Sequence, residues 1–462
     1  MNKTTIMALA AAILLSFGLP AVAEPTGRFA VVSDIHFDPF DPPDITRRLA
    51  DAEPADWAAI LDTIKTQAVS GYGSDTNHAL FRSALAAVAE VAADADFVIV
   101  PGDFLAHGFQ KKAAAALGVS SGSDAVADLA EKTTNYVAGA LRAALPDKPL
   151  ILALGNDDAA CGDYELTPGG PFLAATAETI RDMLGPEALD PDFDTTYSDG
   201  GYYAVGHPTL PGTTVLVVND VLWSERYRDA CSDRGDDAGA RMLDWLEQHL
   251  ERAQAADERI WLVRHIPAGI DAYSTLHSKG GTCASQVVPY LRQPYANWFA
   301  ALMRKYAWIV QVSLAGHIHH DTYRLWTGAD GAALGVDKVV PAISPVFGQN
   351  PGFQVFDYDT GSGTLADFET WYLTNLAAAS LETPGDWKRE YVFTEAYWQP
   401  DYSVGSVAAV WRSLVEGDAM RETFARLYPV GHGEISPDDL PAYVCAIGHI
   451  DRPGFTACHC AR

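Results

Sequence analysis

Short runs of apolar residues recur along the chain, and each ends abruptly in a polar residue. The runs lie at residues 29–32, 97–100, 150–154, 259–263 and 308–314. They are continuous rather than alternating, which is typical of strands that are buried on both faces. We therefore expect a central sheet whose strands finish in polar side chains.

Helical patterns separate these runs. Apolar positions recur at the spacing of one helix face over residues 75–93, 124–145, 238–253 and 295–306. Successive strand–helix units predict an α/β fold with a mostly parallel sheet. In such folds, ligands bind at the carboxyl ends of the strands.

The rest of the chain is more irregular. A segment rich in Gly and Pro, residues 159–199, is expected to form a rim around a site rather than a new domain. From residue 375 the pattern turns helical and aromatic. We therefore predict one large domain over residues 24–374 and a small helical, disulfide-containing domain over 375–462. Additional short strands are expected at 202–205, 213–219, 322–326, 337–340, 353–357 and 365–372.

The N-terminus has the order of a secretory signal. A positive start at Lys3 is followed by an apolar stretch over 6–19 and by Ala21-Val22-Ala23, a small-x-small cleavage site. This pattern predicts a signal peptide over residues 1–23 and a secreted or periplasmic protein. No later segment of the mature chain is apolar over a length that would cross a bilayer.

Cysteine content and net charge limit the possible covalent bonds and binding partners of the chain. Six cysteines in an exported chain indicate disulfides, and the crowding of Cys445, Cys458 and Cys460 predicts at least one local bond. A zinc knuckle at Cys458 and Cys460 is the alternative, although their one-residue spacing does not suit it. The net charge of −28 argues against extended nucleic acid as a partner. A small phosphoester remains compatible, because bound divalent cations dominate a local site.

Carboxylates, an amide and imidazoles follow the strand runs. They are Asp34, His36, Asp103, Asn156, His265, His317 and His319. Because neighbouring strands end at one sheet edge, we expect these side chains to converge on a metal site. Most lie beside a residue that allows a tight turn, such as Gly102, Gly155 or Gly316. Mixed oxygen and nitrogen ligands suit zinc, iron or manganese.

The order Asp-x-His, Gly-Asp, Gly-Asn, His and Gly-His-x-His resembles the calcineurin-like metallophosphoesterases. The stretches 265–269, 316–324 and 343–347, with Asn350-Pro351, resemble the acid sphingomyelinase-like phosphodiesterase branch. This resemblance, over residues 29–372, implies an α/β/β/α sandwich of two mixed β-sheets flanked by helices, with a small helical C-terminal domain.

The resemblance also implies two divalent metal ions, with zinc as the first candidate and iron or manganese as alternatives. The first ion would take Asp34, His36, Asp103 and His319. The second ion would take Asp103, Asn156, His265 and His317. A shared carboxylate holds two cations about 3.5–4 Å apart, and a hydroxide between them would attack phosphorus in line with the leaving oxygen.

The chain departs from the family pattern at two positions. Relatives usually have a histidine after Gly-Asn, where this chain has Asp157. An unperturbed aspartate is almost wholly ionised at neutral pH and donates protons poorly. We therefore expect His107, four residues after Asp103, to protonate the leaving group, with Asp157 as the alternative. Arg264 stands where relatives commonly have a glycine, and its contact with phosphate is an open question.

The resulting hypothesis is a secreted phosphodiesterase with two metal ions and a small phosphodiester substrate. A nucleotide derivative or a phospholipid head group would suit, and the latter would bring the enzyme to a membrane surface. A phosphomonoesterase or nucleotidase with the same metals is one alternative. A non-catalytic periplasmic binding protein is another. The pattern indicates no particular oligomeric state.

Overall fold

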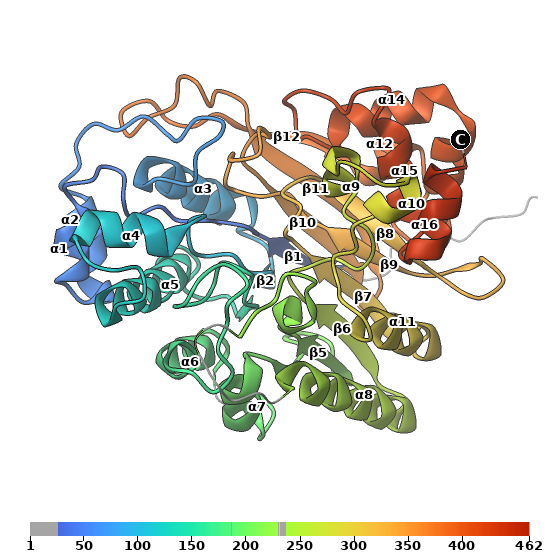
Figure 1. The fold of residues 1–462 in the computed structure, drawn as a ribbon, viewed down its shortest axis with the longest axis horizontal. Coiled ribbons are helices and arrows are strands. Elements are labelled where there is room, and N and C mark those ends of the chain that lie inside the picture. Colours follow the sequence, from blue (N-terminus) through green and yellow to red (C-terminus); the bar gives the residue numbers. More distant parts are fainter. Residues whose placement is uncertain (1–25, 186, 230, 232–236, 462) are drawn as a thin grey trace, which may run out of the picture.

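Two six-stranded sheets form the centre of the protein in the computed structural model (Figure 1). The structure describes residues 26–185, 187–229, 231 and 237–461, so the predicted signal peptide lies outside the described residues. Within these ranges, no helix combines the length and apolar character needed to cross a bilayer.

The first sheet has the strand order β12-β11-β10-β1-β2-β3. Phe29 of β1 lies opposite Phe97 of the parallel strand β2 and opposite Phe356 of the antiparallel strand β10. Its strands are β1 (Thr26–Val31), β2 (Phe97–Val100), β3 (Leu150–Leu152), β10 (Gly352–Asp359), β11 (Leu365–Leu373) and β12 (Trp387–Val392). Only the β1-β2-β3 half of this sheet is parallel.

The second sheet has the strand order β4-β5-β6-β7-β9-β8, with parallel pairs in the middle and antiparallel pairs at both edges. Its strands are β4 (Tyr203–Gly206), β5 (Thr213–Val217), β6 (Arg259–Val263), β7 (Val310–Ala315), β8 (Thr322–Thr327) and β9 (Ala333–Val339). The prediction of one mostly parallel sheet was therefore wrong, because continuous apolar runs do not reveal which strands share a sheet. The two mixed sheets implied by the family resemblance are confirmed.

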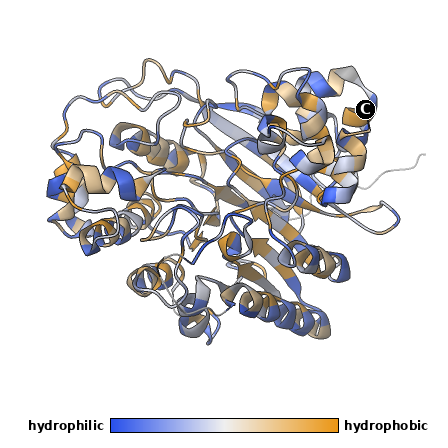
Figure 2. Ribbon diagram, in the orientation of Figure 1, coloured by the Kyte–Doolittle hydropathy of each residue, from blue (hydrophilic) through white to orange (hydrophobic). Residues whose placement is uncertain are grey.

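Aromatic side chains join the two sheets. The Phe29 ring lies 5.1 Å from the ring of Trp261 on β6, and Tyr358 of β10 lies 5.5 Å from the same indole. Full burial of a side chain such as Phe29 contributes about 1.5–3 kcal/mol to stability. Figure 2 shows how hydropathy is distributed: the strands are mostly apolar, and the outer helices carry polar residues on part of their surface.

The four helices expected from periodicity are present. They are α3 (His78–Val91), α5 (Asp124–Ala144), α8 (Ala238–Ala256) and α11 (Tyr295–Lys305). Helix α3 begins later than predicted because Asn77 caps it, its side chain accepting a hydrogen bond from the Leu80 amide. Asp75 therefore lies outside the helix, in the segment that leads to it.

Several elements were not expected. The segment over 159–199 contains two helices, and Phe193 and Tyr197 of the second one are buried in the core. The unexpected helices are α1 (Thr46–Ala50), η1 (Pro54–Asp56), α2 (Trp57–Leu61), α4 (Phe109–Leu117), α6 (Pro171–Leu184), α7 (Phe193–Gly200), η2 (Asp220–Trp223), α9 (Ala272–His277) and α10 (Cys283–Gln286).

The chain after residue 375 is mostly helical, as predicted, but it also supplies strand β12 at the edge of the first sheet. Its helices are α12 (Phe393–Tyr397), α13 (Val404–Glu416), α14 (Asp418–Leu427), α15 (Leu440–Gly448) and α16 (Arg452–His459). Helices α13 and α15 contact β9 and β8 of the second sheet. The domain boundary at residue 375 stays a prediction.

One local disulfide and two long-range disulfides link parts of the chain. Cys445–Cys458 links α15 to α16, which confirms the expected local bond. Cys283–Cys460 ties α16 to α10, and these elements lie together at the upper right of Figure 1. Cys161–Cys231 is the third bond, and none of the described cysteines is free. A zinc knuckle is therefore excluded, because its thiolates are in disulfides.

Candidate metal centre and active site

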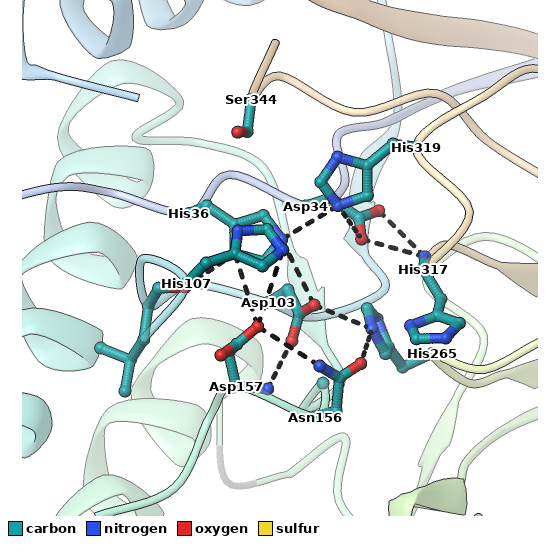
Figure 3. A network of polar contacts seen from close by, with 12 residues as sticks. Asp34, His36, Asp103, His107, Asn156, Asp157, His265, His317, His319 and Ser344 are labelled. Carbon is teal, nitrogen blue, oxygen red and sulfur yellow. Dashed lines mark hydrogen bonds and ion pairs between the residues drawn. The ribbon is translucent and has the colours of Figure 1, made fainter. Parts of the chain in front are cut away.

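The loops that follow the strands bring the predicted metal ligands to one place (Figure 3). Both sheets contribute, since the ligands follow β1, β2 and β3 of the first sheet and β6 and β7 of the second. The residues are Asp34, His36, Asp103, Asn156, His265, His317 and His319. All except His317 are buried, and His317 is half-buried.

Left-handed backbone turns aim many of these side chains. The ligands concerned have φ values between 45° and 70°, namely Asp34, His36, Asp103, His317 and His319. Such values are uncommon for residues other than glycine and cost about 1–3 kcal/mol each. The rest of the fold stabilises these strained turns. This indicates that the orientation of the ligand side chains is required for function.

Two glycines allow the ligand loops to approach one another. A Cβ atom on Gly155 would lie 2.1 Å from Oδ1 of Asp103. A Cβ atom on Gly316 would lie 2.6 Å from Oδ2 of Asp34. Both positions therefore require glycine for close contact with a ligand carboxylate.

Asp103 lies at the centre of the cluster. Its Oδ2 is 3.3 Å from Nε2 of His36 and 3.1 Å from Nε2 of His265. Its Oδ1 accepts a hydrogen bond of 2.9 Å from the Asp157 amide. One carboxylate thus faces imidazoles from both sheets, as a bridging ligand would.

Backbone carbonyls orient the two imidazoles. Nδ1 of His36 lies 2.8 Å from the Leu105 carbonyl oxygen, and Nδ1 of His265 lies 3.0 Å from the Pro101 carbonyl oxygen. Because a carbonyl only accepts, Nδ1 carries the hydrogen in each ring. The other nitrogen of the neutral ring then presents a lone pair to the cluster, which is the usual arrangement of a metal-binding histidine.

In the neutral rings, the Nε2 atoms of His36 and His265 are hydrogen-bond acceptors, and each of them faces another acceptor atom. Nε2 of His36 is 3.1 Å from Nε2 of His319, and Nε2 of His265 is 3.1 Å from Oδ1 of Asn156. The Asn156 amide is held in this orientation, because its Nδ2 donates to Asp163 at 2.8 Å. Neutral acceptors at such distances repel unless a proton or a metal cation lies between them. The donor set therefore fits metal cations.

Two groups of ligand atoms each contain three of the four residues of one predicted set. Asp34, His36 and Asp103 have ligand atoms within 4.8 Å of one another. The same limit holds for Asp103, His265 and His317. A further group, which was not expected, places His107 with His36 and His319.

Electrostatics within the cluster centre on Asp103. Burial would raise its pKa, but the imidazoles of His265 and His36 lower the pKa well below its usual range. Burial would likewise lower the pKa of His265, yet Asp103 raises this pKa to about 9. Burial and the nearby His36 lower the pKa of His319 well below its usual range. Asp103 therefore favours a positive charge on the neighbouring ring nitrogens, and a metal cation bound at these atoms would take the place of their protons.

His107 forms a dyad with Asp75. Its Nδ1 lies 2.8 Å from Oδ1 of Asp75, and its backbone amide donates to Oδ2 at 3.0 Å. Lys112 donates to the same carboxylate at 2.9 Å. The His107 ring stacks on His36 at 4.0 Å, and its side chain remains 33% exposed. His107 thus combines a fixed orientation with access from solvent.

Asp75 was missed as a site residue. Although burial would raise its pKa, the hydrogen bond with His107 and the nearby cations lower the pKa of Asp75 below its usual range. The carboxylate therefore stays ionised and accepts a hydrogen bond from Nδ1 of His107, which fixes the orientation of the ring. Its role depends on a contact between segments 32 residues apart, which no local pattern reveals.

Asp157 lies beside His107. Its Oδ2 is 4.0 Å from Nε2 of His107 and 3.9 Å from Nδ1 of His36. Burial, reinforced by the charge of Asp103, raises the pKa of Asp157 well above its usual range. The expectation of an ionised Asp157 takes no account of this burial, which favours the protonated carboxyl group. Either Asp157 or His107 can hold a proton near the cluster.

Arg264 does not reach the cluster. Its side chain is fully buried and pairs with Asp220 at 3.2 Å and with Asp337. Burial raises the pKa of Asp220, while the charge of Arg264 opposes this rise. Arg264 is therefore a structural partner of two carboxylates rather than a phosphate contact.

Asp158 is a second missed residue. Its Oδ2 accepts hydrogen bonds of 2.8 Å from the amides of Asp103 and Gly155. Its Oδ1 accepts from the Phe104 amide at 2.7 Å. Asp158 thus fastens the loop after β3 to the loop after β2 and positions the central carboxylate. The sequence offered only its place next to Asp157 as a signal.

Known proteins resemble this chain over most of its length. The mouse protein named acid sphingomyelinase-like phosphodiesterase 3b is 24% identical over 446 residues, which cover 94% of this chain and 90% of that protein. The rat protein named cyclic GMP-AMP phosphodiesterase SMPDL3A is 25% identical over 461 residues, with 96% and 93% covered. A solved structure of a dimetal phosphatase from Danio rerio gives a TM-score of 0.41 at 10% identity, with 74% of this chain and 95% of that chain covered.

A model of the family described as calcineurin-like phosphoesterase matches residues 27–321. The matched region includes all the strand ends that supply the clustered carboxylates, amide and imidazoles. The chain therefore belongs to the calcineurin-like phosphoesterases, a family of phosphoester hydrolases.

Proposed function

We propose that this protein is a secreted or periplasmic phosphodiesterase that uses two divalent metal ions to hydrolyse a small phosphodiester. One ion would be held by Asp34, His36, Asp103 and His319. The other would be held by Asp103, Asn156, His265 and His317. Zinc is the first candidate and iron or manganese are alternatives, since all three accept this mixture of ligands.

The observation that carries the proposal is the convergence of acceptor atoms. The pair His36 and His319 and the pair His265 and Asn156 each bring two acceptors within 3.1 Å. Each pair lies near Asp103, so one carboxylate can serve both positions. When bound, the metal pair supplies charge stabilisation for the phosphoryl oxygens and a water of lowered pKa.

The protein groups then have separate tasks. Carbonyl partners hold the imidazoles of His36 and His265 with Nε2 toward the cluster. Asp75 holds His107 through Nδ1, which leaves Nε2 of His107 free to donate a proton to the leaving oxygen. Burial around Asp103 excludes water and strengthens these interactions.

A diester substrate is favoured over a monoester by the relatives. The mouse and rat proteins are both named as phosphodiesterases, and each alignment covers at least 90% of either chain. A phosphomonoesterase remains the second candidate, because the same ligand set serves either ester. Export is supported by the three disulfides, which persist in oxidising compartments.

The proposal is tested with the purified protein after chelation and reloading with zinc, iron(II) or manganese. We expect hydrolysis of bis-p-nitrophenyl phosphate to return with about two ions per chain. Faster hydrolysis of p-nitrophenyl phosphate would favour the phosphomonoesterase. Two bound ions without turnover of either ester would favour a binding protein.

A further inference from the structure

An exposed aromatic ring lies at the mouth of the site. The side chain of Phe347 is 57% exposed, and its ring centroid lies 4.6 Å from that of His319 and 5.4 Å from that of His107. The planes are inclined at 66° and 82°, so Phe347 meets both imidazoles edge to face. A large apolar side chain is therefore held in solvent directly beside the proposed proton donor.

The loop that carries Phe347 is fastened to the site. Nε2 of Gln349 donates to the Ser344 carbonyl oxygen at 2.6 Å and lies 3.4 Å from Nδ1 of His319. The Ser344 hydroxyl donates to Asp75 at 3.3 Å. These bonds link the loop to a predicted metal ligand and to the partner of His107. The position of the Phe347 ring is thus determined relative to the reacting groups.

Two more rings border the same loop. Tyr72 and His432 stack with centroids 3.8 Å apart and planes inclined by 14°. Nδ1 of His432 donates to the carbonyl oxygen of Gly348 at 2.5 Å. The stacked pair is therefore bonded to the residue that directly follows Phe347 in the sequence. The Tyr72 hydroxyl donates to Asn350 at 2.7 Å, at the end of the loop. Tyr72 is itself 42% exposed, so the rim offers aromatic surface from three separate segments.

We propose that this rim, formed by Phe347, Tyr72 and His432, is a stacking site for a planar heteroaromatic base on the leaving group of the phosphodiester. The inference rests on the proposed function and deepens it. Phe347 contacts His107, so the rim lies on the side of the site where the leaving oxygen would be protonated. A nucleoside leaving group carries such a base at the required side of the phosphate.

The chemistry of the rim distinguishes a base from an aliphatic chain. A lipid chain needs a contiguous apolar surface, whereas the exposed ring of Phe347 contacts the imidazoles of His107 and His319, and the other two rings of the rim are a phenol and an imidazole. Each of these rings has a π face together with polar edge atoms, which suits a heteroaromatic base. A single base stacked on an aromatic side chain contributes about 10-fold or more to affinity.

The test compares two diesters of one nucleotide in the metal-loaded enzyme. In one substrate the leaving group is a nucleoside, and in the other it is the same sugar without its base, so both leaving alcohols have matched basicity. We expect kcat/KM to favour the base-bearing diester by about 10-fold in the natural protein. The ratio should fall to about 1 in Phe347→Ala, with the loss mainly in KM.

Two further variants sharpen the test. Phe347→Leu keeps apolar surface but removes the π face, so it should also lose most of the preference. Trp398→Ala is the matched control, because Trp398 is 74% exposed and belongs to the helical C-terminal region. This variant should keep the natural ratio.

Other outcomes would overturn the inference. Equal kcat/KM for the two diesters in the natural protein would exclude a base site while leaving the phosphodiesterase proposal intact. Retention of the preference in Phe347→Ala would exclude this rim. Loss of sedimentation with phosphatidylcholine vesicles in Phe347→Ala, at an unchanged substrate ratio, would make Phe347 a membrane contact instead. Hydrolysis of a phosphomonoester but of neither diester would reject the proposed function and this inference with it.

Discussion

Strand β6 is followed directly by two adjacent residues, Arg264 and His265, whose side chains enter two different buried ionic clusters. Arg264 pairs with Asp220 and Asp337, so the protein supplies both signs of charge there. His265 faces Asp103 and Asn156, where oxygen and nitrogen acceptors converge. Successive side chains at a strand end point to opposite sides, which explains how neighbours reach separate clusters.

The two clusters show how buried charges that stabilise the fold can be distinguished from buried charges that bind a ligand. In the arginine cluster, the guanidinium of Arg264 pairs with both carboxylates, and removing Arg264 would leave two buried carboxylates without their cation. In the histidine cluster, Asp103 faces the imidazoles of His36 and His265, and among the described residues no Arg or Lys side chain pairs with it. A buried carboxylate that faces several metal-ligating side chains is a candidate for ligand binding, whereas one that pairs with a buried guanidinium is a candidate for stability.

The largest effect should follow Asp103→Asn. The amide keeps the shape of the carboxylate but loses the charge that serves both metal positions, so activity should fall by more than about 10³-fold. Metal content per chain, measured by elemental analysis, should fall with it. Asp337→Asn is the matched change in the other cluster and should retain the metal. Loss of metal in both variants would break the comparison.

His107→Ala tests whether the histidine cluster includes the proton donor for the leaving group. A proton donor matters most for a basic leaving oxygen, so alkyl diesters should slow by about 10²–10⁴-fold and p-nitrophenyl diesters far less. Asp75→Asn should show the same dependence on the leaving group with a smaller decrease in rate, because Asp75 acts through His107. If Asp157→Asn shows this dependence and His107→Ala does not, Asp157 is the proton donor.

Arg264→Met should mainly affect stability. It leaves Asp220 and Asp337 buried without their cation, so the free energy of unfolding should fall by about 3–5 kcal/mol in urea titrations. Metal content should stay near that of the natural protein, since Arg264 touches none of the predicted ligands. Adding Asp220→Asn and Asp337→Asn should restore much of the loss. An unchanged free energy of unfolding in the single variant would contradict the structural role.

A smaller, pH-dependent effect is expected at His207, a buried imidazole outside both clusters. Its ring packs against Trp261 at 4.5 Å and Phe97 at 4.9 Å, and burial lowers its pKa to about 4. The unfolded value is about 6.5, so its contribution is present above pH 6.5 and is lost as the pH falls toward 4. The full loss is about 3 kcal/mol.

The measurement is the free energy of unfolding of the natural protein and of His207→Gln between pH 7 and pH 4.5. The variant should show a shallower decline over this interval, because glutamine does not take up a proton. Parallel curves would mean that protonation of other groups controls the acid response.

The metal-ligand candidates could be predicted because each directly follows a run of buried apolar residues. Strand direction and alternation then determine where such side chains lie. Strand β12 escaped prediction because Lys388, Arg389 and Glu390 interrupt its apolar pattern at the sheet edge. Asp75 and the partners of Arg264 escaped it because their contacts join segments far apart in the chain.

The left-handed turns at the ligands have a consequence for protein design. Of the nine non-glycine residues with positive φ among those described, five are candidate metal ligands. Glycine at His317 or His319 would relieve backbone strain of about 1–3 kcal/mol, at the smaller cost of a more flexible unfolded chain. A sequence optimised only for folding would therefore drift away from histidine at these turns. Any redesign of this scaffold for greater robustness has to hold these positions fixed, since there the best-folding residue and the useful residue differ.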